Sequence, residues 1–242
     1  MSGLCIQLDA GMFFGHFLLS TFSLILPPMD KNLKEAFDGL IFDLDGTLWD
    51  STVSVAKAWQ AAKEEVGYVK TDVTPEMVAG IAGMTYDAIY DTLFPDLDSA
   101  KRKEFQALCA KKELEVLEED GGILYPGLEE TLRYLSSRYR LFVVSNCQSG
   151  YIEIFLTYSK LAHYFSGHAC YGTKNQPKAE NIKEVVAQYN LQSPVYIGDT
   201  MGDYESSKKA GVPFIFASYG FGDVKEGQIA TIAQFTDLKE LL

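Results

Sequence analysis

Two aspartates stand two residues apart where an apolar run meets a glycine, in Gly39-Leu-Ile-Phe-Asp-Leu-Asp-Gly-Thr-Leu-Trp-Asp50. Carboxylates suit nucleophilic attack and proton transfer. Because residues two apart on a strand point to the same side, Asp43 and Asp45 could converge on one ligand. Gly46 lets the backbone turn sharply beside them. The plainer alternative is a strand that ends in an acidic turn, since Asp and Gly are ordinary turn residues.

Polar residues follow two further apolar runs, and ligands of open α/β sheets bind outside the carboxyl ends of the strands. Ser145 and Asn146 follow Leu-Phe-Val-Val, and Gly198-Asp-Thr-Met-Gly-Asp203 follows Val-Tyr-Ile. The first pair is also typical of a helix cap, and the second segment of an acid-capped helix. These residues are therefore candidates for the same site as the first two aspartates, with capping as the alternative.

A segment with two lysines, Gly172-Thr-Lys-Asn-Gln-Pro-Lys-Ala-Glu-Asn-Ile182, lies between those two runs. Lys178 directly precedes a helical pattern, whereas Lys174 stands earlier in the loop. For either lysine the alternative is an exposed loop position, where most lysines lie.

Together these segments resemble the four motifs of the haloacid dehalogenase superfamily of phosphohydrolases, in the order of that family. Asp43-Leu-Asp-Gly-Thr-Leu48 resembles the first motif, and the resemblance covers Phe37 to about Leu242. It implies that Asp43 is the nucleophile and Asp45 the general acid and base. Dehalogenases expel halide, which needs no proton, so Asp45 favours a phosphatase.

The resemblance also implies which residues bind the phosphoryl group and a metal ion. The Ser145 hydroxyl and the Asn146 amide would bind phosphate oxygens. Lys178 would do the same, because it fits the lysine-before-helix pattern of the family better than Lys174, although the usual following proline is absent. Mg²⁺ prefers hard oxygen ligands and keeps several waters. Its implied ligands are the Asp43 carboxylate, the Asp45 backbone carbonyl, Asp199 and, in the outer shell, Asp203.

The sequence therefore predicts a Mg²⁺-dependent phosphatase. Its substrate would be a small phosphorylated metabolite, phosphoglycolate-like or a sugar monophosphate, hydrolysed through an aspartyl-phosphate intermediate. One alternative is a phosphotransferase or sugar-phosphate mutase on the same core, which would pass phosphate to a sugar hydroxyl in preference to water. Another is a membrane-tethered or binding protein with a vestigial site.

The order of elements predicts an α/β fold, a Rossmann-like doubly wound parallel sheet with an inserted helical cap domain. Residues 29–52 and 123–242 form the predicted core, and residues 53–122 the predicted cap. The loop Gly80–Thr85 either faces the substrate or is an ordinary turn between helices. Helical patterns before and within the cap are Ser51–Gly67, Thr74–Ala79, Thr85–Leu93 and Ser99–Glu119. Later helices are predicted at Glu129–Arg138, from Tyr151, at Asn181–Tyr189 and at Tyr204–Ala210. Strands are predicted at Gly39–Asp45, Leu141–Ser145, Ala169–Gly172, Val195–Asp199 and Pro213–Ala217.

Composition limits the expected partners and location. The 242 residues carry a net charge of -12, so nucleic acid is not an expected partner and a small phosphate ester is. The sequence leaves the oligomeric state open. The four cysteines lack paired metal-ligand spacing, and we interpret them as reduced thiols of a cytoplasmic protein. They are Cys5, Cys109, Cys147 and Cys170.

Residues 1–28 form a leader whose status is open, with an apolar stretch from Gly11 to Pro28. A secretory signal would begin with basic residues, and as a membrane span the stretch is short and interrupted by polar residues. We favour Met29 as the biological start, because a strand entering Asp43 needs little before it. If residues 11–28 were a true anchor, a membrane would become a partner.

Overall fold

A computed structural model describes residues 33–242, except residue 35 and the side chains of residues 86 and 87. The leader predicted at residues 1–28 lies outside the described residues. Among the helices that the structure describes, none combines the length and the apolar character needed to cross a bilayer.

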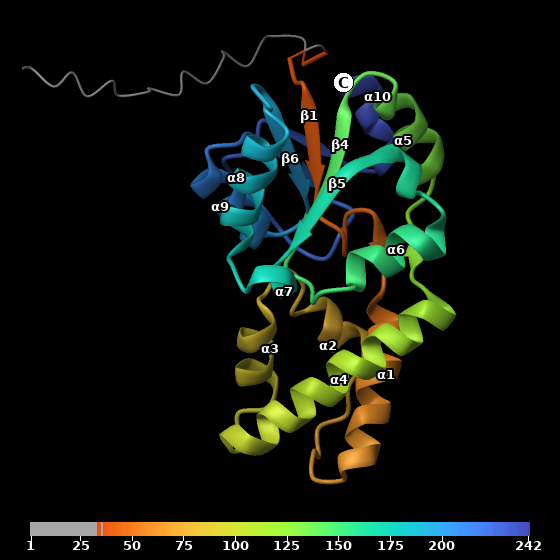
Figure 1. Ribbon diagram of the computed structural model, residues 1–242, viewed down its shortest axis with the longest axis vertical. Helices are drawn as coiled ribbons and strands as arrows, with labels where there is room; N and C mark the ends of the chain where they lie inside the picture. The colour runs from red at the N-terminus through yellow and green to blue at the C-terminus, as the bar shows by residue number, and fades with distance from the viewer. Residues whose placement is uncertain (1–32, 35) are drawn as a thin grey trace, which may run out of the picture.

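A six-stranded parallel sheet forms the centre of the fold (Figure 1). Its strands are β1 (Gly39–Phe42), β4 (Arg140–Ser145), β5 (Phe165–Cys170), β6 (Pro194–Gly198), β7 (Phe214–Ala217) and β8 (Ala230–Ile232). They lie in the order β5-β4-β1-β6-β7-β8, and every pairing is parallel. The chain thus winds outward on one side of β1 and then returns to the other side. The predicted doubly wound α/β fold is confirmed.

Helices cover both faces of the sheet, because the central strand is apolar on both. Leu40 and Phe42 pack into one hydrophobic cluster and Ile41 into another. The first cluster includes side chains of α5 (Leu128–Ser136), α6 (Tyr151–Ser159) and α10 (Leu238–Leu241), and the second includes side chains of α8 (Lys178–Gln188) and α9 (Met201–Ala210). Continuous burial on two faces explains why β1 shows no polar–apolar alternation.

Four helices lie together beyond the carboxyl ends of the strands (Figure 1). They are α1 (Thr52–Val66), α2 (Pro75–Ala79), α3 (Tyr86–Leu93) and α4 (Ser99–Asp120). An aromatic cluster joins three of them, with Trp59 of α1 against Tyr90 of α3, and Tyr90 against Phe105 of α4. This helical insert is the one expected from the sequence, and its exact limits at residues 53 and 122 stay a prediction.

Two short strands carry the chain into and out of the helical insert. β2 (Trp49–Asp50) pairs antiparallel with β3 (Ile123–Leu124), so that Trp49 lies opposite Leu124. The two connections therefore run side by side, directly after the turn that holds the first aspartates. Neither strand was predicted, because two residues are too few for a periodic pattern.

Several predicted boundaries were wrong. β1 ends at Phe42, so Asp43 and Asp45 lie in the following turn and do not share a strand face. The strand expected at Ala169–Gly172 is β5, which begins at Phe165 and gives way to the short helix α7 (Tyr171–Lys174). β5 is an edge strand with the alternating run Ser-Gly-His-Ala, which lacks the apolar signal of the inner strands. The strand β8 and the helices α7 and α10 were not predicted, since each has at most four residues.

Candidate active site

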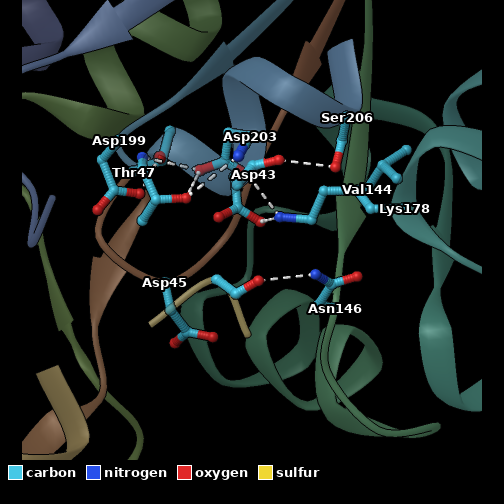
Figure 2. A network of polar contacts seen from close by, with 12 residues as sticks. Asp43, Asp45, Thr47, Val144, Asn146, Lys178, Asp199, Asp203 and Ser206 are labelled. Atoms are coloured by element: carbon cyan, nitrogen blue, oxygen red, sulfur yellow. Dashed lines mark hydrogen bonds and ion pairs between the residues drawn. The ribbon is translucent and has the colours of Figure 1, made fainter. Parts of the chain in front are cut away.

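The carboxyl ends of the three central strands bring the predicted site residues together (Figure 2). Asp43 follows β1, Ser145 ends β4 and Asp199 follows β6. The backbone N–H of Asp43 donates to the carbonyl of Ile197 at 2.8 Å, which extends the β1–β6 contact one residue past the strand. This places the side chains at the reversal of strand order, where open α/β sheets bind ligands.

A tight turn after Asp43 fits against Asp199 because its glycine has no side chain. The carbonyl of Leu44 accepts from the N–H groups of Thr47 and Leu48, at 3.2 and 2.8 Å. Gly46 has φ +82°, and a Cβ there would lie 2.2 Å from Oδ2 of Asp199. The position therefore needs glycine for its backbone conformation and for space.

Lys178 is the lysine that reaches the carboxylates. Its Nζ donates to Oδ1 of Asp43 at 2.9 Å and to Oδ1 of Asp203 at 2.6 Å, and all three side chains are at most 3% exposed. Burial alone would lower the pKa of the Lys178 ammonium, but the charges of Asp203 and Asp43 hold it above its ordinary value. Lys174 lies elsewhere, exposed and paired with Glu184.

Asp199 and Asp203 are held by different sets of donors. Asp199 accepts from the Thr47 hydroxyl at 3.2 Å and from the Phe221 N–H at 2.8 Å. Asp203 closes the capping box of α9, with its Oδ2 accepting from the N–H and the hydroxyl of Thr200. The helix-cap interpretation is therefore also correct for Asp203. Both of its oxygens already have partners in the protein, which fits the supporting position expected for it.

The donor set fits a divalent cation. Carboxylate oxygens of Asp43, Asp199 and Asp203 lie within 4.8 Å of one another, and all three residues are buried. Among the described residues, Lys178 is the cation that pairs with two of them, Asp43 and Asp203. Burial, with the charge of Asp203, raises the pKa of Asp43 to about 7, and burial with the charges of Asp203 and Asp43 raises that of Asp199 to about 8. Burial and neighbouring carboxylates thus disfavour the ionised forms of both groups, and a Mg²⁺ ion, which prefers oxygen ligands, would stabilise those ionised forms.

Asp45 is fixed by three donors to one oxygen. Its Oδ1 accepts from the Trp49 indole N–H at 2.9 Å, the Ser51 hydroxyl at 2.6 Å and the Tyr151 hydroxyl at 2.9 Å. Burial raises the pKa of this carboxyl, and the three hydrogen bonds oppose the shift. None of the three donors was a predicted site residue. The Ser51 hydroxyl is used for the contact with Asp45, while the Asp50 carboxylate accepts from the Thr52 N–H at the start of α1.

A small cavity of about 90 Å³ separates the strand ends from the helical insert. Asp43, Asp45, Ser145 and Asn146 line its floor, and residues 81–84 of the predicted substrate-facing loop line the opposite wall. Further lining residues come from the helical insert, from α6 and from neighbouring loops: Ser51, Thr52, Val55, Trp59, Val78, Ile89, Glu113, Cys147, Tyr151 and Phe221.

The loop between α2 and α3 touches the core at two points. The Asn146 side-chain amide donates from Nδ2 to the Gly83 carbonyl at 2.8 Å. Gly83 has φ +79°, and a Cβ there would lie 2.7 Å from Oγ1 of Thr200. The loop therefore lies directly over the strand ends, with Ser145 beneath it 5% exposed.

Comparison with known proteins decides the family. Residues 40–217 match the sequence model of the family described as haloacid dehalogenase-like hydrolase. The chain belongs to this family. The matched segment contains every predicted site residue, and the prediction of a hydrolase of this family is confirmed.

Curated phosphoglycolate phosphatases are similar along most of the chain. Phosphoglycolate phosphatase of Aliivibrio fischeri is 28% identical over 199 residues, which cover 75% of this chain and 84% of that protein. Phosphoglycolate phosphatase of Aquifex aeolicus is 28% identical over 218 residues, with 84% and 95% covered.

Solved structures of other proteins share the fold. A family member from Streptococcus pneumoniae superposes with a TM-score of 0.74 at 20% identity, covering 84% of this chain and 97% of that one. CbbY from Rhodobacter sphaeroides, solved in complex with phosphate, has a TM-score of 0.70 at 15% identity, with 84% and 96% covered. At these identities the likeness establishes the fold.

Proposed function

We propose that this chain is a Mg²⁺-dependent phosphatase. Its substrate would be a small phosphate monoester, phosphoglycolate-like or a sugar monophosphate, hydrolysed through an aspartyl-phosphate on Asp43. The observation that carries the proposal is the buried cluster in which Lys178 bridges Asp43 and Asp203 next to Asp199. The names of the curated relatives support a phosphatase.

Asp43 is the nucleophile of the proposed reaction. Lys178 holds its Oδ1, which leaves Oδ2 to attack phosphorus. Asp43, Asp199 and the Asp45 backbone carbonyl would hold Mg²⁺, with Asp203 acting through water. When bound, the ion offsets the repulsion between the carboxylate and the phosphate anion.

Asp45 moves the protons of the proposed reaction. Its three hydrogen bonds all reach Oδ1, and Oδ2 has no hydrogen bond to the described part of the chain. In the first step Oδ2 would protonate the leaving oxygen, and in the second it would take a proton from the water that releases phosphate. The burial that raises the pKa of this carboxyl favours the protonated form needed for the first step.

The remaining roles follow from position. The Ser145 hydroxyl, the Asn146 amide and the Lys178 ammonium would bind the other phosphate oxygens. The helical insert would exclude water while the phosphoryl group is transferred. We place the enzyme in the cytoplasm, which the free thiols of Cys109, Cys147 and Cys170 support.

A direct test measures phosphate release from p-nitrophenyl phosphate with Mg²⁺ and with EDTA. We expect activity with the metal, loss of it with EDTA, and loss in Asp43→Asn. Asp96→Asn, an exposed aspartate of the insert, serves as the matched control and keeps activity. Release of phosphate by Asp43→Asn at the normal rate would contradict the proposal.

A further inference from the structure

Two of the cysteines lie together beside the active-site cavity. Cys147 directly follows the predicted phosphate-binding residues Ser145 and Asn146, and it lines the cavity. Cys170 ends β5, just before α7 (Figure 1), and lies opposite Ser145 in the parallel pairing of β4 with β5. The two cysteines therefore connect the active-site end of β4 to the edge strand of the sheet.

Backbone contacts hold the segments that carry these cysteines against each other. The carbonyl of Cys147 accepts from the N–H of Gly172 at 3.0 Å. The Sγ of Cys170 lies 3.5 Å from the carbonyl oxygen of Gln148, the residue after Cys147. A Cβ on Gly172 would lie 2.3 Å from the backbone nitrogen of Ser149, so the two segments pack without space between them. The two sulfurs are thereby kept close together.

The two thiols also interact directly. The Cys147 thiol is in hydrogen-bonding contact with the Cys170 sulfur and with the Ser145 hydroxyl. Hydrogen bonds from Cys147 and Thr173 lower the pKa of the Cys170 thiol to about 6 against the effect of burial, whereas burial raises the pKa of the Cys147 thiol. Near neutral pH the Cys170 sulfur is therefore mostly a thiolate that accepts the proton of Cys147.

Such a pair can be oxidised by hydrogen peroxide, which is small enough to enter the cavity. Cys147 is the partly exposed member that reaches the cavity, whereas Cys170 is 2% exposed. The Cys147 sulfur would attack one peroxide oxygen while its proton passes to Cys170. The O–O bond breaks, and the departing hydroxide takes that proton and leaves as water.

The second step forms the disulfide. The Cys170 thiolate attacks the sulfur of the Cys147 sulfenic acid, and the S–O bond breaks. The hydroxide that leaves takes a proton from solvent and becomes the second water. Each sulfur has then lost one electron, and the peroxide has gained two.

The disulfide would disturb the phosphate-binding end of β4. Its two sulfurs must approach to about 2 Å, which draws Cys147 toward Cys170 and away from the Ser145 hydroxyl. A disulfide sulfur has no proton to donate and is a poor acceptor, so Ser145 loses this partner. Because Asn146 lies between Ser145 and Cys147, the strain also reaches the residue that contacts the insert loop.

We propose that Cys147 and Cys170 form a reversible disulfide when the protein meets a peroxide, and that this bond turns the active site off. The bond itself is independent of the proposed phosphatase function, whereas the loss of activity rests on it. In a reducing cytoplasm both thiols would ordinarily be reduced, and a disulfide there acts as a transient sensor.

Peptide mapping of the full chain tests the bond. Trypsin separates the two cysteines, with Cys147 in the peptide 141–160 and Cys170 in the peptide 161–174. After equimolar hydrogen peroxide, and alkylation of the remaining thiols in denaturant, we expect these peptides to be linked and to separate with dithiothreitol. Cys109, which is fully buried in α4, should be found alkylated and unlinked. Absence of the linked pair would overturn the inference.

Phosphate release from p-nitrophenyl phosphate with Mg²⁺ tests the effect on the site. Peroxide should lower the wild-type kcat/KM by about tenfold or more, since small displacements of positioning groups are costly, and dithiothreitol should restore it. Cys147→Ser, compared with its own untreated sample, should keep its activity after peroxide, and Cys109→Ser should lose activity as wild type does. An equal fractional loss in Cys147→Ser, or a linked pair with unchanged wild-type activity, would overturn the switch.

The two measurements also separate this inference from the proposed function. A full chain without Mg²⁺-dependent phosphate release before any treatment would overturn the phosphatase proposal and, with it, the effect on activity. The linked peptides would still be expected from that protein, and their absence would overturn the disulfide independently.

Discussion

The Nζ of Lys178 lies 2.9 Å from Oδ1 of Asp43, although the two residues are 135 positions apart. Both side chains are almost completely buried, 1% and 3% exposed. A buried ion pair seldom adds net stability, because the cost of removing two charges from water offsets their attraction. The pair is better explained by function: it fixes one oxygen of the nucleophile and supplies positive charge beside the phosphate.

Lys178→Met should abolish phosphatase activity and also destabilise the fold. It leaves the Asp43 and Asp203 carboxylates without their common cation, and breaking a buried pair in this way costs about 3–5 kcal/mol. Thermal unfolding and kcat measure the two effects. Lys174→Met, at the exposed lysine paired with Glu184, should remain close to wild type in both. The reverse pattern would show that the wrong lysine has been assigned.

The stability of the metal-free protein should fall as pH rises from about 5 to 8. Asp43 and Asp199 have pKa values raised by burial to about 7 and about 8, above the unfolded value near 3.8. A raised carboxyl pKa means that the folded state binds more protons than the unfolded state. Protonation of the two carboxyls therefore stabilises the fold fully below the unfolded pKa, and this stabilisation is lost as pH rises through the folded pKa.

Mg²⁺ should reverse that loss, and its effect on Tm should be larger at pH 8 than at pH 5. In Asp199→Asn one buried charge is gone, so the metal-free decline should be shallower and the Mg²⁺ shift should disappear. Scanning fluorimetry across this range, with EDTA or Mg²⁺, measures both. A Mg²⁺ shift in Asp199→Asn as large as in wild type would exclude this carboxylate as a ligand.

Tyr151→Phe should lower kcat by about tenfold and alter its pH profile. The variant removes one of three donors to Oδ1 of Asp45, and such hydrogen bonds lower the pKa of that carboxyl. The pKa of Asp45 should therefore rise. The acidic limb of the pH profile should move to higher pH, because release of phosphate needs the ionised form of Asp45. Tyr158→Phe, an exposed tyrosine on the same helix, is the control. An unchanged pH profile in Tyr151→Phe would show that the Tyr151 hydroxyl does not position Asp45.

The site residues that lie at strand ends could be predicted from the sequence. Asp43, Ser145 and Asp199 follow apolar runs, and parallel strands must bring their carboxyl ends to one edge of the sheet. Lys178 was predicted from its resemblance to the lysine-before-helix pattern of the family, and it begins α8, which packs on that sheet. Asp43 and Asp45 nevertheless do not share a strand face as predicted, because the strand ends before both.

The cavity wall could not be predicted in the same way. Glu113 stands in a helix with many charged residues, and nothing in its spacing distinguishes it from exposed neighbours such as Glu115. Only the packing of α1 against α4 buries it, by placing the Trp59 indole against its carboxylate. Tyr151 likewise reaches Asp45 across 106 residues of sequence, a contact that depends on how α6 packs on the sheet.

Gly83→Ala should reduce kcat/KM by about tenfold while leaving the fold intact. Gly83 has φ +79°, and a left-handed backbone costs a residue with a side chain roughly 1–2 kcal/mol. The new Cβ would also press on the Thr200 hydroxyl, which caps α9. Both effects push the loop away from Asn146 and so destabilise the arrangement in which the loop covers the cavity. Each increase of about 1.4 kcal/mol in the free energy of that arrangement lowers the rate about tenfold.

Gly80→Ala is the matched control on the same loop. Gly80 has helical backbone angles, φ -67° and ψ -14°, and its nearest neighbour for a Cβ lies at 3.4 Å. Alanine there should leave kcat/KM close to wild type, so the pair separates strain at the core contact from a general effect on the loop. Equal losses in both variants would show that the contact between Gly83 and the core does not set the active position of the insert.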